Sequence, residues 1–136
     1  TYKTGEVAPT LNASANGYRL PSEKEWEWAA RGGVSSQGYS YSGSNTVNDV
    51  AWTNVNSSDG TKAVGTKLAN ELGIYDMSGN VFEWCEDVAY TSSRRIRGGS
   101  WDRHTGYATV AARGDSGKPD SRYDYLGFRL ARSSGN

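Results

Sequence analysis

Few side chains in this chain of 136 residues are suited to acid–base or nucleophilic chemistry. His104 is the single histidine, so a Ser-His-Asp arrangement would have to use it, and Asp102 lies only two positions away on the same predicted loop. Glu86 and Asp87 are paired carboxylates, but side chains adjacent in sequence usually point in different directions. Cys85 is the single cysteine, which excludes an intrachain disulfide, a cysteine-based zinc site and a redox pair of cysteines. These residue types favour a protein without a catalytic site.

The stretch from Asp102 to Leu126 has residue types that suit contact with another molecule rather than catalysis. It combines Tyr107, Tyr123 and Tyr125 with glycines and short polar or charged side chains. Antibody binding loops use the same residue types, because tyrosine gives rigid contact area while small polar residues adapt. A solvated loop is the plainer interpretation, but tyrosines at loop tips expose apolar surface that a purely structural loop seldom keeps. The stretch therefore favours binding.

The composition predicts a single globular domain, residues 1–136, with much irregular backbone. The chain has seventeen glycines, nine tyrosines and five tryptophans but two phenylalanines and one methionine. Fifteen basic and fifteen acidic residues balance, and the longest basic run is confined to residues 94–97, so we expect no nucleic acid as partner. No run of eighteen apolar residues exists, so we expect no membrane insertion.

One helix has clear start and stop signals. Ser22 and Glu25 have the spacing of a capping box, which predicts a helix from Pro21 or Ser22 to Arg31. Trp26, Ala29 and Ala30 fall on one face at i, i+3 and i+4, so this face should pack on the core. Glycines at 32 and 33 stand where a helix usually ends in a left-handed residue.

Three segments are predicted to be strands, with loops between them. One begins near Phe82, after a tight Ser-Gly-Asn turn, and residues 95–101 and 127–132 alternate apolar with polar side chains. We expect the last two strands to pair with each other, and Gly33 to Gly60 to form a long loop anchored by aromatic residues. Tryptophans and a lone cysteine inside such elements are more often core residues than ligand platforms. The residues expected in the core on this ground are Trp26, Trp28, Trp52, Trp84, Trp101 and Cys85.

Four ordered motifs resemble those of the formylglycine-generating enzyme (sulfatase-modifying factor) family. They are Gly17–Gly33, Gly73–Trp84, Arg97–Trp101 and Gly127–Ala131, in the family's order and spacing. The resemblance implies an α+β, C-type lectin-like fold with little regular secondary structure, one clear helix and short antiparallel strands. It also implies that an N-terminal part of the family domain is missing.

The resemblance argues against catalysis by this chain. Catalytic members carry two cysteines shortly after the Gly-Gly-Ser-aromatic motif, and by spacing these positions are Arg103 and Ala108 here. Neither residue can form a thiolate, so copper-dependent oxidation of a cysteine substrate loses its chemical groups and we expect no copper site. The alternative is a fragment of a formylglycine-generating or sulfoxide-synthase-like oxidase.

The resemblance also implies a calcium site. Asp76, Gly79, Val81 and Glu83 match four calcium-binding positions of the enzymes, through two side chains and two backbone carbonyls. Oxygen-only ligation with two acidic groups suits calcium. Two plainer interpretations stay open: Asp76 caps the turn, and Glu83 pairs with an arginine.

A second resemblance concerns the tyrosine-rich stretch. The frame of residues 98–101 and 127–130 around residues 102–126 is similar to the variable region of proteins diversified by diversity-generating retroelements. There, mutation of template adenines turns asparagine codons into codons for residues such as Tyr, Asp, His, Ser and Gly. The implied function is a receptor-type protein on a cell or virion surface, with a protein or glycan ligand. The other alternative is a structural assembly domain of a phage or cell-surface protein. The positions that correspond to variable sites are Asp102, Arg103, His104, Gly106, Tyr107, Gly114, Asp115, Ser116, Ser121, Tyr123, Asp124 and Tyr125.

Overall fold

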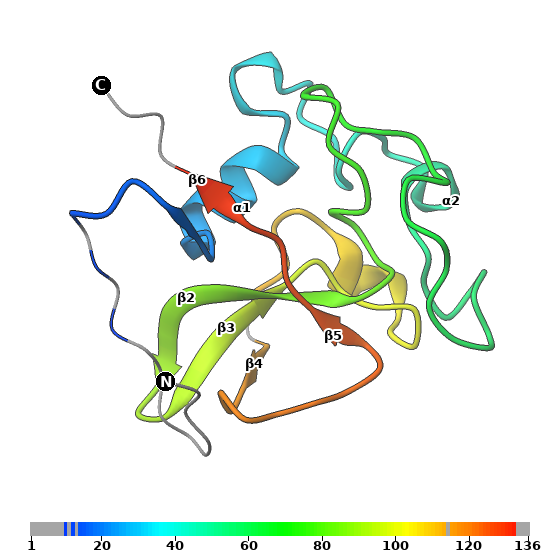
Figure 1. Ribbon diagram of the computed structural model, residues 1–136. Coiled ribbons are helices and arrows are strands. Elements are labelled where there is room, and N and C mark those ends of the chain that lie inside the picture. Colours follow the sequence, from blue (N-terminus) through cyan, green and yellow to red (C-terminus); the bar gives the residue numbers. More distant parts are fainter. Residues whose placement is uncertain (1–9, 11, 13, 114, 133–136) are drawn as a thin grey trace.

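Short elements joined by long loops make up the α+β architecture (Figure 1), in agreement with the composition. The computed structural model describes residues 10, 12, 14–113 and 115–132. In chain order the elements are β1 (Tyr18–Arg19), α1 (Glu23–Ala30), η1 (Gly33–Ser35), α2 (Val47–Val50), β2 (Phe82–Tyr90), β3 (Ser93–Arg97), η2 (Thr105–Ala108), β4 (Ser116–Gly117), β5 (Leu126–Gly127) and β6 (Ala131–Arg132).

Helix α1 follows the predicted signals. The Ser22 side chain accepts a hydrogen bond from the Glu25 amide, and the Glu25 carboxylate accepts one from the Ser22 amide, which completes the capping box. The helix ends at Ala30, and Gly32 adopts a left-handed φ of 89°. Eight residues are too few for a helix that is stable alone, so α1 depends on the packing of Trp26 and Ala30 in the core.

The main sheet has the order β4-β3-β2-β5. Strands β2 and β3 form an antiparallel hairpin, β4 adds antiparallel to β3, and β5 lies parallel to β2. The prediction that residues 95–101 pair with residues 127–132 is therefore wrong, since β2 lies between β3 and β5 and β6 pairs with β1. Alternation of apolar and polar residues identifies a strand with one solvated face, but it carries no information on the neighbouring strand.

A small core lies between α1 and the sheet. Trp26, Ala30, Met77, Cys85 and Val110 form one buried cluster. Cys85 is fully buried as predicted, and burial raises the pKa of its thiol to about 12, so the thiol stays protonated and unreactive at neutral pH.

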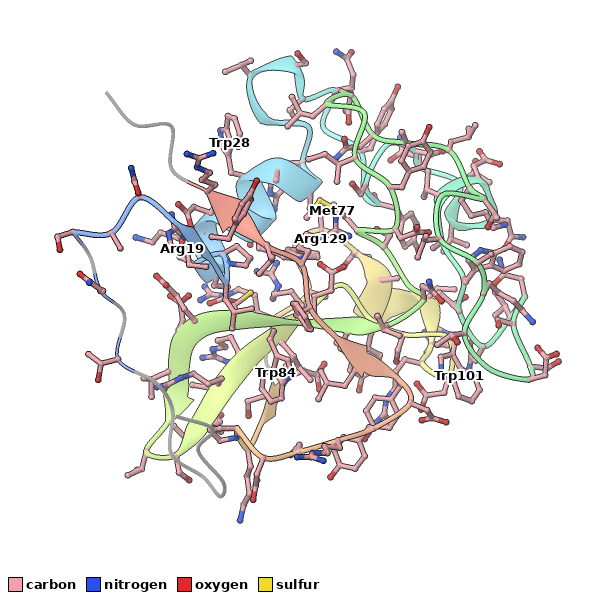
Figure 2. The ribbon with its side chains drawn as sticks, viewed as in Figure 1. Arg19, Trp28, Met77, Trp84, Trp101 and Arg129 are labelled. Atoms are coloured by element: carbon pink, nitrogen blue, oxygen red, sulfur yellow. The ribbon has the colours of Figure 1, made fainter. Side chains whose placement is uncertain are left out.

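The tryptophans divide between core and surface. Trp26 is buried and Trp52, Trp84 and Trp101 are partly buried, but Trp28 is 55% exposed. The prediction of a core position is wrong for Trp28, because residues two apart on a helix lie on nearly opposite faces and Trp26 already occupies the inner one. Figure 2 shows Trp28 on the outer side of α1, away from Met77.

Residues 36–81, between η1 and β2, form a long coil that contains most of the loop predicted at Gly33 to Gly60. It is interrupted by the single turn of α2 (Figure 1). Its end is joined to the core where Gly79, with a φ of 74°, forms a parallel bridge with Trp52. A Cβ at Gly79 would collide with the Trp52 backbone, so this close approach requires glycine.

Candidate ligand-binding surface

Side chains from two loops meet on one surface. The guanidinium of Arg103 lies 5.5 Å from the ring centroid of Tyr125. Tyr125 in turn stacks on Tyr123, with ring centroids 4.9 Å apart and an interplanar angle of 5°. Offset aromatic stacking and cation–π contacts each stabilise by about 0.5–1.5 kcal/mol in such positions. The fold therefore brings the two ends of the tyrosine-rich stretch together at Tyr125.

The candidate binding residues are accessible wherever the structure describes them. Tyr107 is 45% exposed and Tyr123 is 53% exposed, so their rings are not part of the core. The partly exposed members are Asp102, Asp115, Ser116, Ser121 and Tyr125. The exposed members are Arg103, His104, Gly106, Tyr107, Tyr123 and Asp124. Gly114 lies outside the described residues. We call the eleven described members the loop surface.

Backbone hydrogen bonds attach this loop surface to the scaffold. The Phe82 amide donates to the Tyr125 carbonyl at 2.8 Å, at the point where β2 begins. The Ile96 amide donates to the Asp115 carbonyl at 3.3 Å. Each bond joins a residue of the scaffold to a residue of the variable-like stretch, so the path of the loop backbone does not depend on the exposed side chains alone.

Two further anchors lie near Arg103 and Ala108. The Asn54 amide donates to the Arg103 carbonyl at 3.1 Å, and the buried Ser78 hydroxyl donates to the Ala108 carbonyl at 2.7 Å. Ala108 itself is buried. Nothing in the sequence around Asn54 indicates this contact, because it joins residues 49 positions apart that share no motif. Sequence reasoning therefore missed Asn54 as a neighbour of the surface.

Potential catalytic groups on the loop surface have local structural partners. Asp102 accepts a hydrogen bond from the Ser100 hydroxyl at 2.6 Å. The Nδ1 atom of His104 accepts one from the Gly106 amide and so caps η2. Burial raises the pKa of Asp115, and the nearby positive charge of Arg103 acts in the opposite direction. These contacts organise the loop and do not assemble a nucleophile with a base.

An arginine–glutamate network supports the base of the loop. Glu23, in the first turn of α1, accepts hydrogen bonds from Arg113 at 2.7 and 2.9 Å and from the buried Arg97 at 3.2 Å. Arg97 also donates to Glu27 and to the Val110 carbonyl. The bond to Arg113 lowers the pKa of Glu23, against the effect of burial, with further lowering from Arg97. Only the position of Glu23 at the helix start could have indicated this network from sequence.

The paired carboxylates have a similar structural role. Asp87 accepts a hydrogen bond from the Glu23 amide at the N-terminus of α1, where negative charge is favourable. Glu86 belongs to the same strand, β2, and its own amide donates to the Pro21 carbonyl. This part of β2 therefore positions the start of the helix.

The four residues of the predicted calcium set lie around the turn before β2. Asp76 accepts a hydrogen bond from the Gly65 amide at 2.7 Å. Glu83 is buried, pairs with Arg129 at 2.6 Å and accepts a hydrogen bond from the Trp26 indole at 2.7 Å. Arg129 and Trp26 thus occupy the Glu83 oxygens, and a cation does not fit there without displacing the arginine. Ligation by Asp76, Gly79, Val81 and Glu83 stays a prediction, which a calcium-dependent rise in melting temperature would check.

No group of three or more His, Cys, Asp or Glu side chains within the described part of the chain is placed to hold a metal ion. No helix of the described chain has the length and apolar character needed to cross a membrane.

The short elements, the long coil and the pairing of β1 with β6 define a domain of the C-type lectin-like class. Residues 3–134 match the family described as sulfatase-modifying factor enzyme 1-like domain. The chain belongs to this family, as the four motifs indicated.

The curated relatives include a formylglycine-generating enzyme and a protein named as an inactive one. The chain is 38% identical over 136 residues to the inactive C-alpha-formylglycine-generating enzyme 2 of Bos taurus, a match that covers 88% of the chain and 45% of the relative. It is 34% identical over 158 residues to the formylglycine-generating enzyme of Streptomyces coelicolor, covering 92% of the chain and 50% of that enzyme. The chain spans no more than half the length of the curated relatives it matches.

One similar solved structure is that of Treponema denticola variable protein 1. It superimposes with a TM-score of 0.80 at 39% identity, over 90% of this chain and 50% of that protein. This likeness supports both the fold and the resemblance to variable proteins.

Proposed function

We propose that this domain is a non-catalytic binding module that presents the loop surface to a protein or glycan ligand. The main support for the proposal is the division of roles within residues 102–125: the backbone is bonded to the scaffold, and the side chains form the accessible surface. Backbone carbonyls of Arg103, Asp115 and Tyr125 are bonded to scaffold amides, while the Tyr125 ring contacts the Arg103 guanidinium and stacks on Tyr123. A surface ordered before binding loses little conformational entropy on binding.

Absence of catalysis is the second part of the proposal. Arg103 is exposed and Ala108 is buried, and neither side chain supplies a thiol at the positions that the resemblance assigns to catalytic cysteines. An inactive formylglycine-generating enzyme and a variable protein both resemble this chain. Display on a cell or virion surface is part of the same proposal.

The proposal is tested by removing the tyrosines of the loop surface. The domain is first screened for binding on glycan and protein arrays, and the variant Tyr107→Ala/Tyr123→Ala/Tyr125→Ala is then measured against each hit. Exposed tyrosines at the centre of an interface are frequent hot spots, so we expect at least a tenfold loss of affinity, or ~1.4 kcal/mol or more. The melting temperature should change little, because these rings lie outside the buried core cluster.

A matched control removes three other tyrosines. Tyr18, Tyr75 and Tyr90 are 70%, 47% and 67% exposed and lie outside the loop surface. The variant Tyr18→Ala/Tyr75→Ala/Tyr90→Ala should keep full affinity. Equal losses in both variants would contradict the proposal, and so would unfolding of the loop-surface variant.

Sequences of sibling proteins separate the binding module from a structural assembly domain. Variation confined to the loop surface favours binding of changing ligands, whereas an invariant stretch favours packing on a fixed subunit. A near-copy of the coding segment beside a reverse-transcriptase gene would establish diversification. Oxygen consumption with copper and a thiol substrate would instead support the oxidase alternative.

A further inference from the structure

A second exposed aromatic site lies on α1, outside the loop surface. Trp28 is 55% exposed although it lies in the longest helix of the described chain. Its ring rests on Gly33: a Cβ at that position would come within 2.8 Å of Trp28 Cη2 and 3.1 Å of Leu72 Cδ1. Because Gly33 has no side chain, the Trp28 indole can pack against the backbone there. A large part of the indole surface stays exposed to solvent.

Cationic side chains line the same pocket as this indole. Lys24 and Arg31 lie at i−4 and i+3 from Trp28, so all three share one face of the helix. Together with Arg113, Glu23 and Glu27 they line a pocket of about 400 Å³. This volume lies within the range of about 300–1,000 Å³ that is usual for small-molecule sites.

The two arginines of the pocket are held in place by carboxylates. Arg113 donates through Nε and Nη2 to Glu23, at 2.9 and 2.7 Å. Arg31 uses its Nε and Nη2 atoms on Glu27, at 2.9 and 2.8 Å. Among the contacts of the described residues, Nη1 of each guanidinium stays available as a donor. The Arg113 side chain is 62% exposed and that of Arg31 is 42% exposed, so a ligand can reach both.

The balance of charge at the pocket is positive. Glu23 and Glu27 are also bonded to the buried Arg97, so their negative charge is shared with a cation beneath the pocket. The pocket therefore contains an aromatic ring, the ammonium of Lys24 and two guanidiniums that are held by carboxylates. The Nη1 atom of each guanidinium can donate a charge-assisted hydrogen bond to a carboxylate or sulfate oxygen, which is stronger than a hydrogen bond between neutral groups.

We propose that this pocket, the Trp28 pocket, binds an acidic saccharide. The apolar face of a pyranose ring would stack on the Trp28 indole, and the carboxylate or sulfate of the sugar would accept hydrogen bonds from Arg31 and Arg113. An indole in an open, shallow pocket can stack on the apolar face of a sugar ring. An isolated anion would gain nothing from contact with the indole, so the aromatic ring favours an acidic sugar over a simple anion. The site is independent of the loop surface and of the proposed function.

Binding is tested by calorimetry on the full chain at low salt with three probes. These are a glucuronate-containing tetrasaccharide, a neutral N-acetylglucosamine tetrasaccharide and tetraglutamate. We expect the acidic saccharide to bind at least about tenfold more tightly than either other probe, and its affinity to fall several-fold between 50 and 200 mM salt. Tighter binding of tetraglutamate, equal binding of the neutral sugar, or no binding of the acidic sugar overturns the proposal.

Single variants locate the binding site. Trp28→Ala should weaken binding of the acidic saccharide by about tenfold and Arg31→Gln by about three- to tenfold, both with nearly unchanged melting temperatures. Phe128→Ala, at a residue that is 66% exposed, and Lys62→Gln, which removes one positive charge outside the pocket, serve as matched controls. Unchanged affinity in Trp28→Ala, or an equal loss in the controls, places the binding elsewhere and overturns the proposal.

Discussion

Glu23 shows how much a single buried carboxylate contributes to this domain. Its side chain is 7% exposed and contacts Arg97 and Arg113, which come from β3 and from the loop after η2. Arg97 is itself only 1% exposed, and its guanidinium lies 5.0 Å from the Trp26 ring. A buried ion pair is not always a net source of stability, but removing Glu23 leaves the buried Arg97 charge less compensated, with Glu27 and the Val110 carbonyl as its remaining partners among the described residues.

Glu23→Gln should therefore be strongly destabilising. We expect the free energy of unfolding, measured by urea titration, to fall by about 3 kcal/mol, because Arg97 loses a charged partner in the core. Arg113→Gln is the control, since solvent screens this exposed guanidinium and its loss should destabilise the domain less than the loss of Glu23. Similar losses in the two variants would show that the exposed half of the network, not the buried half, carries the effect.

At the scale of the element, α1 depends on charge as well as on packing. Glu25 completes the capping box and bonds to Arg19, at 2.6 and 2.7 Å. The Arg19 bond, helped by Ser22 and opposed by burial, lowers the pKa of Glu25 to about 2. Because the folded-state pKa lies below the unfolded value, ionised Glu25 contributes stability above about pH 4.5, and this contribution is lost as the pH falls towards 2.

The free energy of unfolding should therefore decrease between about pH 5 and pH 2. Glu25→Gln should flatten this decrease, and at pH 7 it should cost about 1 kcal/mol or less because Glu25 is half exposed. Ser22→Ala should also cost about 1 kcal/mol, but with less change in the pH dependence, since the Arg19 pair remains. Denaturant titrations at a series of pH values measure both effects, and an unaltered acid slope in Glu25→Gln would count against the assignment.

At the scale of the whole molecule, the domain is a small core with long loops attached at a few points. Amides of Asn54, Phe82 and Ile96 come from three separate parts of the scaffold and bond to carbonyls of the loop surface. These attachments come from residues outside the variable-like stretch. The backbone of the loops should therefore tolerate wide variation in their exposed side chains.

Hydrogen exchange measures this tolerance. In the variant Arg103→Ser/Tyr123→Ser/Tyr125→Ser, protection of the three scaffold amides should change by less than about tenfold, or ~1.4 kcal/mol. Any change in amide protection should come from the lost stacking among these side chains. Loss of protection at all three amides would show that the side-chain stack, and not the frame, holds the loops in place.

Local signals determined much of this protein from its sequence. The Ser22–Glu25 capping box placed α1, the Ser-Gly-Asn turn placed the start of β2, and the order of four motifs indicated the family. The amino-acid types between Asp102 and Tyr125 indicated a surface, and the described members are at least partly exposed. Each of these signals depends on residues a few positions apart, whose relation is set by backbone geometry.

Tertiary structure alone decided which distant residues meet. It placed β2 between β3 and β5, stacked Arg103 on Tyr125, and bonded Asn54 to the Arg103 backbone. It also turned Trp28 outwards beside Arg113, since the inner face of α1 is filled by Trp26. Such contacts depend on how the whole chain closes around one small core, and side-chain type or spacing along the sequence carries little information about them.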